Sequence, residues 1–170
     1  MGLFDFLTGT KRPQKGVTPA LAPDVEAALL ALNRDTAPWQ VIRDTSDKGD
    51  LIAEWRIVNA KWYEIFAKAG LTRVFRIRMK LDPMTHTVRA VDEEYCIEWR
   101  AGVPSLSLAA SGFRGQKKEV SFGMAYAFTE ELKPGVVYNY RFRTSEIKAP
   151  LQDTVTGLGW TWKGVAFGKL

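Results

Sequence analysis

The sequence predicts an α+β fold: one domain built on a curved sheet or partly closed barrel of about seven to nine mainly antiparallel strands, with two or three helices packed on it. The chain has 170 residues and is 46% hydrophobic, which is enough for one sizeable core but short for two. Aromatic residues make up 12% and include six tryptophans, and such side chains favour the half-buried surface of a sheet. Segments of alternating polarity outnumber segments of helical period, which indicates a β-rich chain.

We expect an N-terminal region, residues 1–22, ahead of a single α+β domain that spans residues 23–170. Residues 8–22 are rich in glycine, proline, threonine and basic side chains, a composition typical of a linker. The apolar tip before them is a candidate anchor for a membrane or a partner, and its residues are Leu3, Phe4, Phe6 and Leu7. We favour the alternative that this tip folds back onto its own core, because one short turn of helix binds lipid weakly.

Three segments of the predicted domain have helical patterns. The first begins at Pro23, carries apolar residues on one face, and stops near Asn33. The second spans residues 59–70, where large apolar residues recur at helical spacing and a glycine ends the pattern. The third spans residues 145–157 and places Pro150 in its first turn. We expect all three helices to pack on the sheet.

Strands are predicted between these helices and after them. Each segment alternates apolar and polar residues or is bounded by turn residues. Pro104 stands near the start of one of them and suggests an edge strand. The predicted strands cover residues 39–43, 51–58, 73–81, 88–98, 103–108, 120–128, 138–143 and 160–167.

The two central strands carry charged residues at alternate positions. Arg76, Arg78 and Lys80 lie on one face and at first suggest a basic stripe for phosphate groups. Across the turn DPMTHT, we pair Arg78 with Asp92 and Arg76 with Glu94. We therefore interpret the stripe as a neutralised face in contact with solvent.

Enzyme chemistry has little support in the sequence. Cys96 shares a strand face with two glutamates, which disfavour a reactive thiolate, and His86 stands in a predicted hairpin turn without a residue to orient it. The acidic run at residues 92–94 cannot place three carboxylates on one strand face, so no metal site is predicted. The chain has no nucleophile elbow, zinc-protease, phosphate-loop or dinucleotide motif. We expect no cofactor.

The last predicted hairpin carries the sharpest hypothesis about a binding site. Its aromatic residues share the core face, and the opposite face places Arg141 and Arg143 beside alanine and glycine with no acid across the strand. Arginine matches carboxylate and phosphate oxygens, and small neighbours let a ligand approach. Three other interpretations remain open: the arginine stems shield the small residues, an acid reaches them from elsewhere, or the first helix packs there. The candidate anion-binding residues are Arg141, Arg143, Asn139, Ser121, Lys117 and Lys118.

The chain closes with a predicted core strand rather than a stacking platform. Trp160 and Trp162 alternate in one phase, whereas Val165 and Phe167 follow in the other. A bulge at Gly164 would shift the phase by one residue and turn all four side chains to the same core.

The composition limits the function classes. A single cysteine excludes an intrachain disulfide, and no apolar run is long enough for a spanning helix, so we expect a cytoplasmic protein. A net charge of +5 is too mild to indicate a nucleic-acid partner. We expect a non-enzymatic binding module for an anionic small molecule or headgroup. The alternative is a structural protein that acts through homo-oligomerisation or partner docking.

Overall fold

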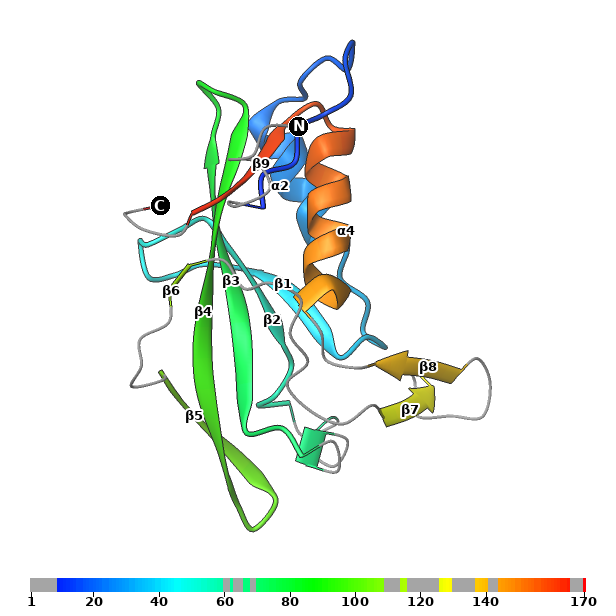
Figure 1. The fold of residues 1–170 in the computed structure, drawn as a ribbon, viewed down its shortest axis with the longest axis vertical. Coiled ribbons are helices and arrows are strands. Elements are labelled where there is room, and N and C mark those ends of the chain that lie inside the picture. The colour runs from blue at the N-terminus through cyan, green and yellow to red at the C-terminus, as the bar shows by residue number, and fades with distance from the viewer. Residues whose placement is uncertain are drawn as a thin grey trace.

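The computed structural model of the chain describes residues 9–59, 62, 66–67, 70–108, 114–115, 126–129, 137–140, 144–165 and 170. Within these residues, two helices stand beside a long curled sheet, and a small hairpin lies apart from it (Figure 1). The elements are α2 (Ala22–Leu30), β1 (Trp39–Arg43), β2 (Leu51–Trp55), β3 (Arg73–Asp82), β4 (Thr87–Arg100), β5 (Val103–Leu108), β6 (Arg114–Gly115), β7 (Tyr126–Thr129), β8 (Val137–Tyr140), α4 (Thr144–Gly157) and β9 (Thr161–Gly164).

Among the described residues the main sheet has seven strands, of which five follow the antiparallel path β1-β2-β3-β4-β5. The short strands β6 and β9 also pair with β4, and β9 does so in the parallel direction. β7 and β8 form a separate antiparallel pair. The predicted α+β class with a curved, mainly antiparallel sheet is confirmed, and β5 ends the path as Pro104 predicted.

The core lies between the concave side of the sheet and the two helices (Figure 1). In α2, Val25 and Leu29 are one turn apart and fully buried, and α4 buries apolar residues at the same spacing. Trp160 and Trp162 are fully buried and Val165 nearly so, which confirms the predicted inward phase of these three residues, while Phe167 lies outside the described residues. The α4 contribution consists of Ile147, Leu151 and Val155.

Helix α4 is longer than predicted. It begins at Thr144, and Pro150 therefore lies inside the helix rather than in its first turn. Proline has no backbone N–H, so the helix loses one hydrogen bond at this position. The Pro150 carbonyl accepts a hydrogen bond from the Thr154 hydroxyl at 2.8 Å. The predicted helix at residues 59–70 falls mostly outside the described residues, although Trp62 and Phe66 are fully buried. None of the described helices is long and apolar enough to cross a membrane.

The register between β3 and β4 differs from the prediction by one residue. Asp82 pairs with Thr87 across a four-residue loop, so Arg78 lies opposite Val91 and Arg76 opposite Glu93. A slip of one residue turns a whole strand face over. The predicted pairs of Arg78 with Asp92 and Arg76 with Glu94 are therefore wrong.

An extended segment, residues 9–21, lies against the C-terminal end of the chain. The backbone of Lys11 exchanges two hydrogen bonds with Trp162, at 2.9 and 2.8 Å. The indole of Trp160 donates to the Ala20 carbonyl at 2.8 Å. Gly159 has a φ of +76°, and a Cβ there would stand 2.8 Å from Pro19, so this close crossing requires glycine.

Candidate functional site

Three basic side chains lie side by side on adjacent strands of the sheet. Lys80 of β3 is directly opposite Arg89 of β4, and Arg89 is beside Lys163 of β9. Neighbouring strands are about 4.8 Å apart, so the three Cα atoms span roughly 10 Å. We call Lys80, Arg89 and Lys163 the basic row.

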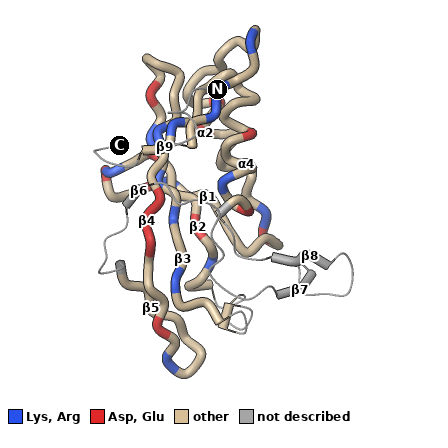
Figure 2. The backbone as a smooth tube through the Cα atoms, viewed as in Figure 1, with Lys and Arg blue, Asp and Glu red and all other residues tan. Residues whose placement is uncertain are grey.

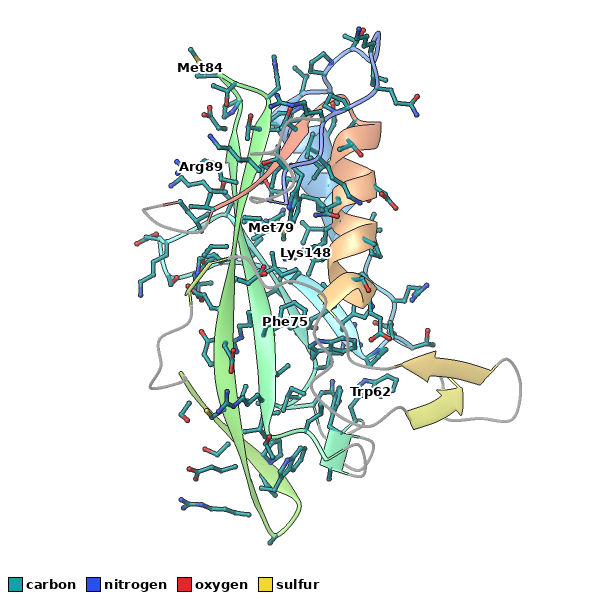
Figure 3. All side chains as sticks on the ribbon, in the orientation of Figure 1. Trp62, Phe75, Met79, Met84, Arg89 and Lys148 are labelled. Carbon is teal, nitrogen blue, oxygen red and sulfur yellow. The ribbon has the colours of Figure 1, made fainter. Side chains whose placement is uncertain are left out.

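The basic row faces away from the core. Its neighbours in sequence, Val88 and Trp162, are fully buried on the helix side, and successive side chains of a strand point to opposite faces. Lys80 and Lys163 are exposed and Arg89 is half-buried. Figure 3 shows Arg89 on the side of the sheet opposite α4, and Figure 2 shows basic residues where β4 and β9 meet.

Like charges directly opposite each other destabilise a sheet by a few tenths of a kcal/mol up to about 1 kcal/mol. The basic row contains two such contacts, Lys80 with Arg89 and Arg89 with Lys163. A bound anion would add an attraction to each of the three cations and so offset these repulsions.

Two acids lie near the basic row and offset part of its charge. Asp82 accepts hydrogen bonds from the Thr85 hydroxyl at 2.8 Å and the Met84 amide at 3.0 Å. The Thr85 hydroxyl, the turn amides and the charge of Arg89 hold the pKa of the Asp82 carboxyl below its usual value. Asp50 accepts a bond from the Leu81 amide at 2.7 Å. Both carboxylates thus already accept hydrogen bonds from backbone amides at this end of the sheet.

Arg76 and Arg78 of β3 lie on the same face as Lys80 and are paired inside the fold. Arg78 binds Asp44 and, at 3.1 Å, Glu93, beneath the loop that joins β1 and β2. Arg76 binds Glu54 at 2.8 Å. The predicted neutralisation of these arginines is therefore confirmed, but with different acids, and the predicted contact with solvent is wrong for Arg78, which is buried. These ion pairs involve none of the three residues of the basic row, which lies on the same face of the sheet.

Two carboxylates are buried on the concave face of β4. Asp92 binds Lys148 of α4 at 2.6 Å, and Glu94 binds Arg73 at 3.1 Å. Asp92 and Glu94 are almost wholly buried, and each carboxylate is matched by a cation. The arrangement ties α4 to the sheet. In the part of the chain that the structure describes, no group of three potential metal ligands occurs.

A shallow hollow of about 480 Å³ lies between the N-terminal segment and the last turn of α4. The residues that line it include one cation, Arg12, and one anion, Asp153, beside neutral residues. The hollow therefore does not select for an anion or a cation.

Nearly all the residues predicted for the anion site and the anchor lie outside the described residues. The exception is Asn139 in β8, which pairs with Ala127 of β7. The residues outside are Arg141, Arg143, Ser121, Lys117, Lys118, Leu3, Phe4, Phe6 and Leu7. His86 does stand in the β3–β4 turn, with a left-handed φ of 46° and its ring edge-on to Trp160.

Sequence reasoning placed Lys80 in a stripe with Arg76 and Arg78, but it did not bring Arg89 or Lys163 beside Lys80, because only the strand pairing joins these three residues. Lys163 reaches Arg89 through a parallel pairing that no local pattern indicates. The contact of Lys80 with Arg89 follows from the four-residue loop, and the correct loop length would have revealed it. Comparison of the chain with protein-family models, curated proteins and solved structures finds no match.

Proposed function

We propose that the protein is a non-enzymatic binding module for an anionic group. The observation that carries the proposal is the basic row, in which three adjacent strands present Lys80, Arg89 and Lys163 on one face. Phosphate or carboxylate oxygens suit this arrangement, because charge-assisted hydrogen bonds from several cations converge on one ligand.

The pair Arg141 and Arg143 stays in the proposal as a second anion site. The hypothesis assumed a hairpin in which aromatic residues meet across the strands. The backbone pairing of β7 with β8 supports this assumption. It places Tyr126 opposite Tyr140 and Phe128 opposite Tyr138. The two arginines follow directly in the sequence.

Isothermal titration calorimetry with pyrophosphate tests the basic row. We compare the wild type with the triple variant Lys80→Ser, Arg89→Ser, Lys163→Ser, and with a control that loses three exposed charges elsewhere, Arg43→Ser, Lys48→Ser, Arg100→Ser. Both variants change the net charge equally. We expect the row variant to bind at least about tenfold more weakly, since each 1.4 kcal/mol of lost contact is a factor of ten. Equal losses in both variants would contradict the proposal.

Partner docking on a sheet edge is the second candidate function, and β5 is the observation that favours it. It ends the sheet path, whereas the outer edge of β1 is closed by Asn33, whose side chain bonds both backbone groups of Val41 at 2.6 and 2.7 Å. Light scattering after size-exclusion chromatography tests self-association. A monomer at all concentrations would contradict it.

A further inference from the structure

We propose that the protein forms a symmetric dimer in which the outer edge of β5 pairs in the antiparallel direction with β5 of a second copy. The inference rests on the proposed docking of a partner at this sheet edge and names that partner. Within the described residues β5 ends the sheet path, and no described strand pairs with its outer side. Figure 1 shows that the hairpin of β4 and β5 extends past the other labelled elements at one end of the long axis.

The backbone groups of Leu106 point out of this edge. Leu106 lies opposite Ile97 of β4, and the Ile97 amide donates a hydrogen bond to the Thr72 carbonyl at 2.8 Å, on the side of β4 that faces β3. Both backbone groups of a residue in an antiparallel strand point to the same side, so Ile97 and Leu106 exchange no hydrogen bonds with each other. The N–H and C=O of Leu106 therefore face away from β4.

The turn before β5 gives the same phase. Its two central residues, Ala101 and Gly102, have φ of 49° and 79°, as in a two-residue hairpin turn of type I′. The pair that closes such a turn is hydrogen-bonded, so Val103 faces β4 and the alternate positions Pro104 and Leu106 face outward. Proline suits this position because its missing N–H falls on the outer side of an edge strand.

The sequence of β5 does little to block pairing at this edge. Natural edge strands are protected by charged side chains or by a covering segment. The segment VPSLSL has no charged residue, and Val103 is 53% exposed. At the other end of the sheet path, the Asn33 side chain bonds both backbone groups of Val41 in β1. The two edges of the path therefore differ, and β5 is the one that suits an added strand.

A second copy fits because the edge is self-complementary. In an antiparallel pair centred on Leu106, the two Leu106 residues exchange two hydrogen bonds. The Pro104 carbonyl then accepts a bond from the Leu108 amide of the second copy, so the pairing needs no donor from proline. The same register places Ser105 opposite Ser107 of the second copy, and no like charges meet. A two-fold contact of this kind closes after two molecules.

Amide hydrogen exchange at increasing protein concentration tests this pairing at single residues. The Leu106 amide bonds to the second copy in the dimer, so its exchange should slow by at least about tenfold as the dimer forms. The Ser105 amide, which faces β4, is the internal control and should exchange at the same rate at every concentration. Slow exchange of Leu106 in a monomeric chain, independent of concentration, would show that another part of the same chain holds this edge. That result would overturn the inference.

Two double variants test the register. Ser105→Lys, Ser107→Lys and Ser105→Glu, Ser107→Glu each place like charges opposite each other across the two-fold axis. Each variant should therefore self-associate at least about tenfold more weakly than the wild type. An equimolar mixture of the two variants should associate again, because every lysine then faces a glutamate. Size-exclusion chromatography with light scattering measures both effects, and association of the mixture also shows that both chains are folded.

The matched control is Ala27→Lys, Ala31→Lys, which adds the same charge at two exposed positions in and just after α2. Its self-association should stay within about twofold of the wild type. A wild type that is monomeric at every concentration would overturn both the inference and self-association. A dimer that the lysine variant at β5 leaves unchanged, or a mixture that does not associate, would overturn pairing through β5. Self-association through another surface would then still stand.

Discussion

At the scale of single residues, the basic row makes a prediction about the ligand-free protein. Lys80 lies directly opposite Arg89, and removing a like charge from such a pair relieves repulsion. Lys80→Thr also places a β-branched residue in a strand. We expect the variant to be more stable than the wild type by up to about 1 kcal/mol while binding anions more weakly. Urea unfolding measures the first effect, and a clear loss of stability would show that Lys80 has a structural role instead.

The buried pair of Asp92 and Lys148 should behave differently. Lys148→Met leaves the Asp92 carboxylate in the interior without its 2.6 Å partner, and breaking a buried pair in this way costs about 3–5 kcal/mol. The double variant Asp92→Leu, Lys148→Met removes both charges and should recover most of that loss. Chemical denaturation of the single and double variants tests this cycle. A loss below about 1 kcal/mol in Lys148→Met would contradict the pairing.

The Asp44 carboxyl should make the free energy of unfolding depend on pH. Burial alone would raise the pKa of its carboxyl, but hydrogen bonds from Ser46 and Arg78 outweigh burial and lower the pKa below its ordinary value of 3.8. The ionised Asp44 carboxylate therefore contributes its full stabilisation above about pH 4. This stabilisation is lost as the pH falls through the lowered pKa that Asp44 has in the folded state. The free energy of unfolding of Asp44→Asn should fall less steeply with acid than that of the wild type. Parallel curves would show that Asp44 is not part of the acid response.

At the scale of elements, the sequence patterns predicted most strands and the two described helices, because periodicity is a local property. Strand β1 has the predicted bounds, and the inward phase of β2 at Leu51, Ala53 and Trp55 is as expected. The register of β3 with β4 was wrong because it depends on a single loop length. That error placed Asp92 and Glu94 on the solvent side, whereas both lie in the core and are neutralised by cations that only the tertiary fold supplies.

The N-terminal segment and Gly159 form one unit, and this unit has its own test. Gly159→Ala imposes a left-handed φ on a residue with a Cβ, and its Cβ would stand 2.8 Å from both Pro19 and the Thr18 carbonyl. The backbone conformation alone costs about 1–2 kcal/mol, so we expect a loss of at least that size together with faster hydrogen exchange at the Lys11 amide.

Gly157→Ala is the matched control for this test, because a Cβ at Gly157 would meet no atom within 4 Å. It should leave both stability and the exchange rate of the Lys11 amide close to the wild-type values. Similar behaviour of the two variants would show that the crossing of residues 18–19 over Gly159 is not a tight contact.

At the scale of the whole molecule, the two faces of the sheet differ in how their charged residues are arranged. On the helix side, buried acids meet Lys148 and Arg73 and hold the fold together. On the outer side, Arg76 and Arg78 are paired within the fold, while the basic row places like charges side by side. The sequence predicted an anion site on the last hairpin, whose Arg141 and Arg143 lie outside the described residues. The basic row could not be predicted, since it requires the parallel contact between β4 and β9.

The measurement that tests the central claim most directly is a two-dimensional amide NMR titration of the protein with pyrophosphate. Anion binding at the basic row predicts that the largest chemical-shift changes lie at the amides around Lys80, Arg89 and Lys163, on three adjacent strands, and that they saturate together. Changes confined to Arg141 and Arg143 would place the anion on the last hairpin instead. The absence of saturable changes on these three strands would contradict the account.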